Sequence, residues 1–174
     1  MRRLHPLIAE NINVLRQGIA LIEQITDAMY ANAKPPMMES GVGGHIRHCI
    51  DFYHRFLSSF QLGRINYVLR QRNPLIETSR RLAVSEIEAI IERLSPLSAD
   101  DLQNEVQVIA EDLPGPMDAS VENRSSVGRE LQALLGHTIH HYAMVALALR
   151  LQGVEPSAEF GVAPSTLTYW RRTA

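Results

Sequence analysis

Long stretches of this chain repeat apolar residues at steps of three and four positions, which is the spacing of one face of an α-helix. The longest stretch covers residues 4–32 and contains Leu4, Leu7, Ile8, Ile12, Leu15, Ile19, Ile22, Ile25 and Met29. Pro6 fits the first turn of such a helix, and Lys34-Pro35-Pro36 cannot continue it. The pattern therefore predicts one long amphipathic helix over residues 4–32.

Three further helices are predicted by the same spacing and by residues that start or stop helices. They cover residues 42–61, residues from the capping-box pattern Ser85-x-x-Glu88 to Leu94, and residues from Ser125 or Ser126 to about Gln152. Gly63 and Gly153 are placed to end the second and the fourth helix. Together the four helices predict an all-α fold, a four-helix bundle in which residues 64–82 form a long crossover between the second and third helices.

Two segments lack the helical pattern. Residues 102–122 alternate apolar and polar residues on both sides of Leu113-Pro114-Gly115-Pro116, which predicts a small β-hairpin before the fourth helix. The residues after Gly153 predict an irregular tail. A length of 174 residues fits one domain, so we expect a single domain over residues 1–174, with the bundle at 4–153 and the tail at 154–174.

The net charge and the hydropathy of the chain argue against two classes of partner, nucleic acids and membranes. The formal net charge is −2 and the sequence pI is about 6.4, so no basic field draws the chain to nucleic acid or to an anionic membrane. No apolar run approaches the roughly 20 residues that cross a bilayer, and Met1-Arg2-Arg3 precedes no apolar signal segment. The single cysteine, Cys49, lies on the apolar face of the second helix and fits a reducing compartment. We expect a cytoplasmic protein that binds neither nucleic acid nor membrane.

Histidines are the most distinctive chemical feature of the sequence. Six of the seven fall on two predicted helices: His45, His48 and His54 on the second, and His137, His140 and His141 on the fourth. Because His137 and His141 are four residues apart, both rings project from one face of their helix. Two histidine clusters on separate helices of a bundle predict a metal site, and three protein nitrogens with open positions are typical of a catalytic one. Hydrogen-bonded core histidines are the alternative interpretation.

The second helix offers two candidates for the third ligand. At about 100° per residue, His45 lies at the edge of the apolar face, whereas His48 lies further round, toward Asp51 and Arg55. Helical phase alone therefore favours His45.

Taken together, the two histidine segments resemble those of the DinB/YfiT-like superfamily of metal-binding four-helix bundles. Residues 44–51, Gly-His-Ile-Arg-His-Cys-Ile-Asp, and residues 137–142, His-Thr-Ile-His-His-Tyr, match that family's His-x-x-Asp and His-x-x-x-His in order and spacing. The resemblance implies one divalent metal ion bound by His48, His137 and His141. It favours His48 over His45, because Asp51 follows His48 by three residues. Three imidazoles suit Zn, Ni and Fe alike.

The same resemblance suggests a function. Relatives of this superfamily include S-transferases that use low-molecular-weight thiols and maleylpyruvate isomerase-like proteins. The resemblance therefore implies a metal-dependent transferase or isomerase of the thiol type that acts on a small-molecule substrate; the alternative is a non-catalytic metal-binding or stress-related protein. Side chains expected to contact the ligating histidines or the substrate are His45, Asp51, Glu130 and Tyr142. The family's usual Arg-Gly after the last histidine is replaced here by Tyr142-Ala143.

Residues outside the predicted helices suggest further contacts. In the crossover, Arg64, Arg70 and Arg72 form either a fork for a substrate carboxylate or a solvated surface. Apolar residues in 102–122 and in the tail, where Leu167, Tyr169 and Trp170 occur, exceed what a loop needs. We therefore expect a homodimer.

Overall fold

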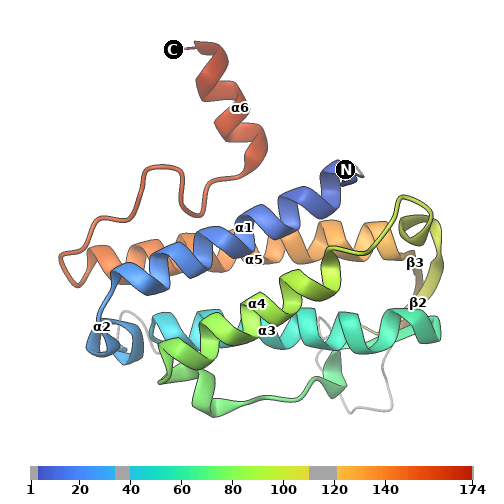
Figure 1. Cartoon of the computed structure of the whole chain (residues 1–174), viewed down its shortest axis with the longest axis horizontal. Helices are drawn as coiled ribbons and strands as arrows, with labels where there is room; N and C mark the ends of the chain where they lie inside the picture. Colours follow the sequence, from blue (N-terminus) through green and yellow to red (C-terminus); the bar gives the residue numbers. More distant parts are fainter. Residues whose placement is uncertain (1–3, 34–39, 110–120, 174) are drawn as a thin grey trace.

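The computed structural model is mostly helical and contains one small sheet (Figure 1). It describes residues 4–33, 40–109 and 121–173. Within these ranges the helices are α1 (Pro6–Gln24), α2 (Asp27–Ala31), α3 (Val42–Ser59), α4 (Arg80–Leu94), α5 (Val127–Arg150) and α6 (Pro164–Thr173). The strands are β1 (Arg64–Asn66), β2 (Glu105–Ile109) and β3 (Glu122–Ser126).

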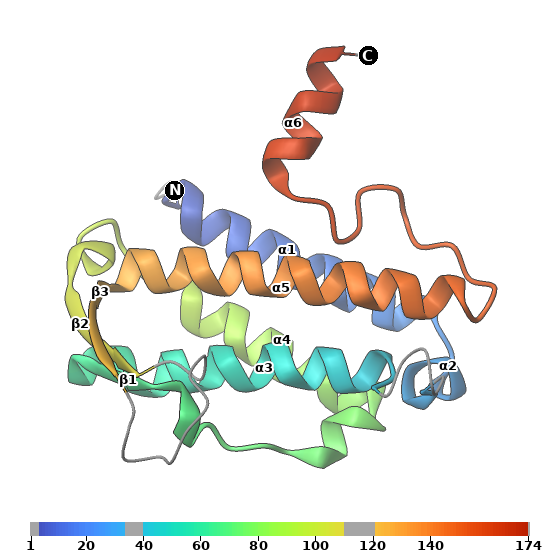
Figure 2. The ribbon, with the colours of Figure 1, turned by 180° about the vertical axis from the view of Figure 1, so that it is seen from behind.

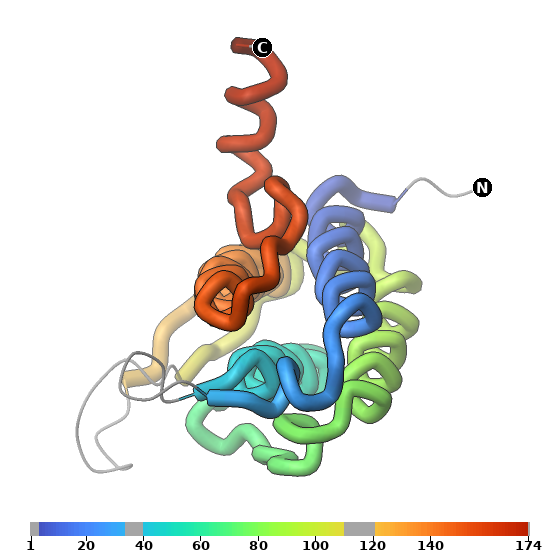
Figure 3. Tube along the Cα trace, turned by 90° about the vertical axis from the view of Figure 1, so that its left-hand side faces the viewer, coloured from blue at the N-terminus to red at the C-terminus, as the bar shows by residue number. Residues whose placement is uncertain are grey.

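The four long helices surround one hydrophobic core. Helix α1 packs against α4 and α5, and α3 packs against the same two helices. Figure 3 shows these four helices end-on, arranged around a common centre. Fully buried side chains from each helix meet there, among them Ile8, Tyr53, Ile87 and Leu131. This confirms a helical fold of the expected kind, although six helices and a sheet are more than a four-helix bundle contains.

The first predicted helix is in fact two helices. Residues 4–32 break after Gln24, because Ile25 adopts an extended conformation and the Thr26 side chain accepts a hydrogen bond from the Met29 amide, which caps α2. Arg80 stabilises the break from the start of α4: it donates to the carbonyl oxygens of Ile22, at 2.9 Å, and of Ile25. These carbonyls have lost their helical partners, so the break needs a donor distant in sequence.

The crossover ends earlier than predicted, before Arg80, and it contains more regular structure. Helix α4 begins at Arg80, since the Ser79 side chain accepts a hydrogen bond from the Leu82 amide at 3.2 Å. Ser85 and Glu88 lie inside α4, so the prediction of a capping box at Ser85 was wrong. The residues between α3 and α4 contain β1 and three short 3₁₀ turns, Phe60–Leu62, Tyr67–Leu69 and Pro74–Glu77.

Two antiparallel strands precede α5, as predicted, but the second strand extends beyond the predicted range of 102–122, and a third strand joins the pair. Strands β2 and β3 are antiparallel, with Glu105 opposite Ser126 and Ile109 opposite Glu122. Strand β1 pairs with β2 in parallel, and no local sequence pattern predicted this third strand. The turn predicted at residues 113–116 lies outside the described residues. The sheet lies at the end of the molecule where α3 ends and α5 begins (Figure 2).

The predicted irregular tail contains a helix. Helix α6 starts at Pro164, whose missing amide is tolerated in a first turn, and projects away from the other helices (Figures 1 and 2). It buries none of its residues, and the side chains of Tyr169 and Trp170 are 64% and 46% exposed. Among the described helices, none combines the length and the apolarity needed to cross a lipid bilayer.

Candidate metal centre

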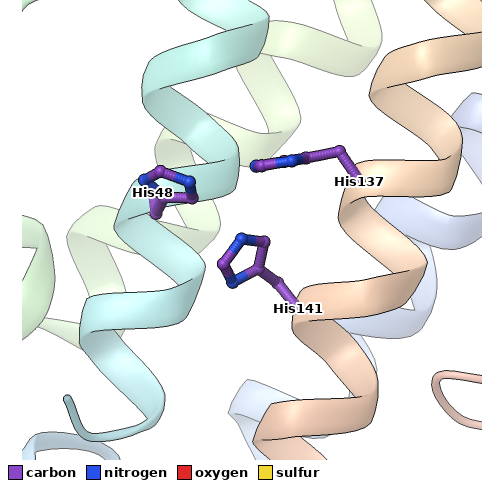
Figure 4. A group of neighbouring side chains, drawn as sticks. All are labelled: His48, His137 and His141. Atoms are coloured by element: carbon purple, nitrogen blue, oxygen red, sulfur yellow. The ribbon is translucent and has the colours of Figure 1, made fainter. Parts of the chain in front are cut away.

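Three histidines from two helices meet between α3 and α5. His48 faces α5 from the middle of α3, while His137 and His141 extend from successive turns of α5 (Figure 4). One nitrogen of each ring lies within 4.8 Å of a nitrogen of both others. The ring centroids are 4.9 Å apart for His48 and His137, and 4.5 Å apart for His48 and His141. Three imidazoles at this separation, called the triad below, could hold one metal ion.

His45 lies one turn before His48 and contacts only part of this group. Its Nδ1 is 3.0 Å from Nδ1 of His141, so one ring donates a hydrogen bond to the other. It does not belong to the group of three whose nitrogens approach one another. The structure thus brings His48, which the family resemblance favours, toward both histidines of α5, and it places His45, which helical phase favours, behind His141.

The imidazoles of His48 and His141 are held in the neutral form that binds metals. Burial lowers the pKa of His48 to about 4, helped by the charges that His137, Arg70 and Arg47 would carry. Burial lowers the pKa of His141 to about 3, with further contributions from His137 and His48. Neutral imidazoles at neutral pH offer lone pairs without first releasing protons, so the donor set fits a divalent ion.

An aromatic wall adjoins the triad. The Phe52 ring lies 4.9 Å from the His48 ring and 4.6 Å from the His137 ring, measured between centroids, and stacks on Tyr67 at 5.2 Å. The guanidinium of Arg70 is 4.6 Å from the centre of the Phe52 ring and donates to the Tyr67 carbonyl oxygen. Arg70 is buried, so it is not part of a solvated surface. Arg64, in contrast, is exposed and pairs with Glu122.

A cavity of about 620 Å³ opens beside the triad, between α3, α5 and the sheet. His48, His137 and Phe52 line it from the helices, and Ser125 of β3 lines it from the sheet. Glu130, in the first turn of α5, also lines this cavity and accepts a hydrogen bond from the Ser125 hydroxyl at 2.6 Å. Glu130 is therefore placed to contact a molecule in the cavity rather than a histidine.

The other two predicted contact residues are directed elsewhere. Asp51 is buried and pairs with Arg47, and burial raises its pKa although Arg47 opposes that rise. Tyr142 is fully buried, stacks on Phe160 and approaches Gly18 of α1 so closely that no side chain fits there. Its hydroxyl thus lies between α5 and α1. The structure therefore brings neither the Asp51 carboxylate nor the Tyr142 hydroxyl to the triad.

Cys49, His54 and His140 lie outside the group of three, although the His140 ring contacts that of His141, with the centroids 5.4 Å apart. Cys49 is buried in the core, as predicted, and burial raises the pKa of its thiol to about 12. His54 pairs with Glu86 across to α4 at 2.8 Å, and His140 is exposed on α5. Phe52 was not predicted as a site residue, although it follows His48 by four residues and therefore shares a face of α3 with it.

Protonation of His48 and His141 is expected to destabilise the metal-free protein in acid. The folded pKa values of His48 and His141, about 4 and about 3, lie below the ordinary value of 6.5. The unfolded chain therefore binds more protons in this window, and the free energy of unfolding falls as pH falls from about 6.5. Because both rings are half-buried, we expect a loss of only about 1–3 kcal/mol.

The measurement is urea denaturation of metal-free protein across this pH range, beside the double variant His48→Ala, His141→Ala. The variant should show the smaller pH dependence, because the carboxylates and other histidines are common to both proteins. If the free energy of unfolding depended on pH equally in both proteins, the two rings would titrate normally.

Known proteins resemble this chain in sequence and in fold. The solved structure of a DinB-like protein of Bacillus subtilis, YjoA, matches with a TM-score of 0.62 over 86% of this chain and 93% of that chain. At 19% identity this likeness shows a shared fold only. FK506-binding protein 5 of Rhizopus delemar is 33% identical over 112 residues, which are 62% of this chain but only 28% of that protein.

The family assignment depends on a match of nearly full length. The sequence model of the DinB family matches residues 3–171, which include α1 to α5, the sheet, the three histidines and most of α6. The chain belongs to the DinB family.

Proposed function

We propose that this protein binds one divalent metal ion, Zn, Ni or Fe, through His48, His137 and His141, and that it acts on a small molecule as a metal-dependent transferase or isomerase of the thiol type. The observation that carries the proposal is the convergence of three imidazole nitrogens within 4.8 Å, beside a cavity of about 620 Å³. A site that served structure alone would not need an adjoining cavity.

Three protein ligands leave coordination positions open, and a divalent ion there would act as a Lewis acid and lower the pKa of a bound thiol. The protein's own side chains prepare the site. Burial keeps His48 and His141 neutral, and the Phe52 and Tyr67 rings cover the wall next to His48 and His137. A substrate in the cavity would therefore meet the triad at an aromatic wall, which shields reacting groups from water.

His45 has a positioning role in this proposal. A ring that binds a metal through one nitrogen keeps its proton on the other, and that proton needs an acceptor. Nδ1 of His45, 3.0 Å from Nδ1 of His141, provides one if His141 ligates through Nε2. Burial lowers the pKa of His45, which favours the neutral, accepting form.

The wider proposal concerns the whole chain. We propose that α1, α3, α4 and α5 form a four-helix bundle within a single domain over residues 1–174, that the protein acts in the cytoplasm, and that it forms a homodimer through α6. The exposed Tyr169 and Trp170 support the last point, because large side chains of this kind are usually covered in an assembly.

The homodimer is testable by light scattering. We expect a mass of twice 19.5 kDa at micromolar concentration. The double variant Tyr169→Ser, Trp170→Ser should shift the mass to that of one chain without loss of helix content by circular dichroism, because both side chains are outside the core. A monomeric mass for the unaltered protein would contradict the homodimer.

The proposed activity is tested by metal analysis followed by turnover. The purified protein is expected to contain one divalent ion per chain and to transfer a small bacterial thiol to an electrophile, with the rate abolished by a chelator and restored by Zn, Ni or Fe. Metal-free protein under the same conditions is the control. Bound metal without turnover for any thiol or electrophile would favour the non-catalytic alternative, and absence of bound metal would overturn the proposal.

A further inference from the structure

The cavity beside the triad contains a buried carboxylate with few partners. Glu130 is 8% exposed, and its only hydrogen bond of normal geometry within the described ranges comes from the Ser125 hydroxyl, at 2.6 Å. No described residue forms an ion pair with Glu130. An ionised carboxylate has about four acceptor sites, so one hydroxyl leaves most of its hydrogen-bonding capacity unused.

The surroundings of Glu130 supply no ion-pair partner and at most one further donor, the Tyr67 hydroxyl. Burial raises the pKa of Tyr67, and the charge of Glu130 and a contact with that carboxylate at hydrogen-bond range raise it further, although the hydroxyl makes no hydrogen bond of normal geometry. Arg124 and Arg129 line the same cavity but are exposed and form no ion pair with Glu130. The N-terminus of α5 favours a negative charge at this position but is not a counter-ion. A buried carboxylate is costly unless a cation or several donors compensate it.

The carboxylate and the triad are at two ends of one binding space. Glu130 precedes His137 by seven residues on α5, which is two turns on one face and about 10 Å along the axis. Both side chains line the cavity, together with the apolar side chains of Phe52, Val108 and Leu134. A molecule that extends from one end to the other would meet nitrogen ligands, then apolar surface, then a carboxylate.

We propose that the cavity selects a small organic molecule that carries a protonated amine, with the ammonium group donating to Glu130 and an apolar spacer leading to the triad. The ammonium group supplies an ion-pair partner for Glu130, which has none among the described residues. The position of the other end at the metal rests on the proposed function above, whereas the amine subsite depends on Glu130 alone.

The experiment compares two thiols of one length by titration calorimetry with zinc-loaded protein at neutral pH. Aminohexanethiol carries an ammonium group, and mercaptohexanol carries a neutral hydroxyl at the same position. A charge-assisted hydrogen bond predicts that the amine binds about tenfold more tightly or better. Glu130→Gln should reduce the ratio of the two affinities to about one, since the amide keeps the size and the acceptor for Ser125. Glu122→Gln, on exposed β3, should leave the ratio unchanged.

A variant with a shorter acidic side chain and a measurement without metal make the test decisive. Glu130→Asp retains the charge and should retain part of the preference for the amine, whereas a merely structural glutamate would give no charge-dependent pattern. In metal-free protein, hexylamine should shift more NMR signals around Glu130 than hexanol does. If zinc does not bind, the proposed function fails and the hexylamine comparison still decides the amine subsite. Equal binding of amine and alcohol, or an unchanged ratio in Glu130→Gln, would overturn the inference.

Discussion

Replacing His48, His137 or His141 by alanine is expected to lower the affinity for a divalent ion by more than about a hundredfold. Loss of a side chain that only supports a metal ligand already costs about 10–100-fold, and each of these replacements removes one of three ligands. The three rings converge from α3 and α5, so no neighbouring imidazole of the triad can substitute for another. Metal content after dialysis and competition with a coloured chelator measure the loss.

Three histidines serve as matched controls. His54 pairs with Glu86 and His140 is exposed, so His54→Ala and His140→Ala should leave the metal content unchanged. His45→Ala should keep the metal at reduced affinity, because it removes a hydrogen bond to His141 and not a ligand. Loss of metal from His45→Ala together with full retention in His48→Ala would show that helical phase, and not the triad geometry, identifies the ligand.

A second large effect is expected from Gly43→Ala in α3. A Cβ atom at this position would lie 2.0 Å from the carbonyl oxygen of Glu77 and 2.8 Å from Cε1 of Tyr30. The first contact is with backbone, which cannot rotate away, so α3 and the Pro74–Glu77 turn must separate. We expect a loss of about 3 kcal/mol in the free energy of unfolding and a fall in Tm of roughly 10 °C.

Gly136→Ala provides the opposite result in the same protein. Gly136 lies in the middle of α5, and no atom would lie within 4 Å of its added Cβ. Alanine there should raise the free energy of unfolding by about 0.8–1.0 kcal/mol, which is the difference in helix propensity. Thermal denaturation of both variants tests the pair. If Gly43→Ala unfolded at the same temperature as the unaltered protein, close packing of α3 on the Glu77 backbone would be refuted.

Helix ends that depend on neighbouring residues were predictable from the sequence. Helix α5 begins after Ser126, whose side chain accepts a hydrogen bond from the Arg129 amide, and the chain turns after it at Gly153, where φ is 80°. Gly63, with φ at 71°, ends the helical segment that contains α3. At these points a cap or a glycine decides the structure locally.

Features that depend on distant residues were not predictable. The break between α1 and α2 uses donors from Arg80, and β1 pairs with a strand some forty residues further along the chain. The same reason hid part of the candidate site. The histidine spacing on α5 indicated a shared face, but only the fold places Phe52 and Tyr67 beside that face and Glu130 in the same cavity.

The burial of Cys49 has a spectroscopic consequence. It is the only cysteine in the sequence, its side chain is 3% exposed, and its thiol pKa is about 12, so it supplies no thiolate at neutral pH. In protein substituted with cobalt(II), an intense near-ultraviolet band from sulfur-to-metal charge transfer must therefore come from a thiol added to the solution. The near-ultraviolet spectrum of the unaltered chain can therefore report directly whether an external thiolate has bound to the ion.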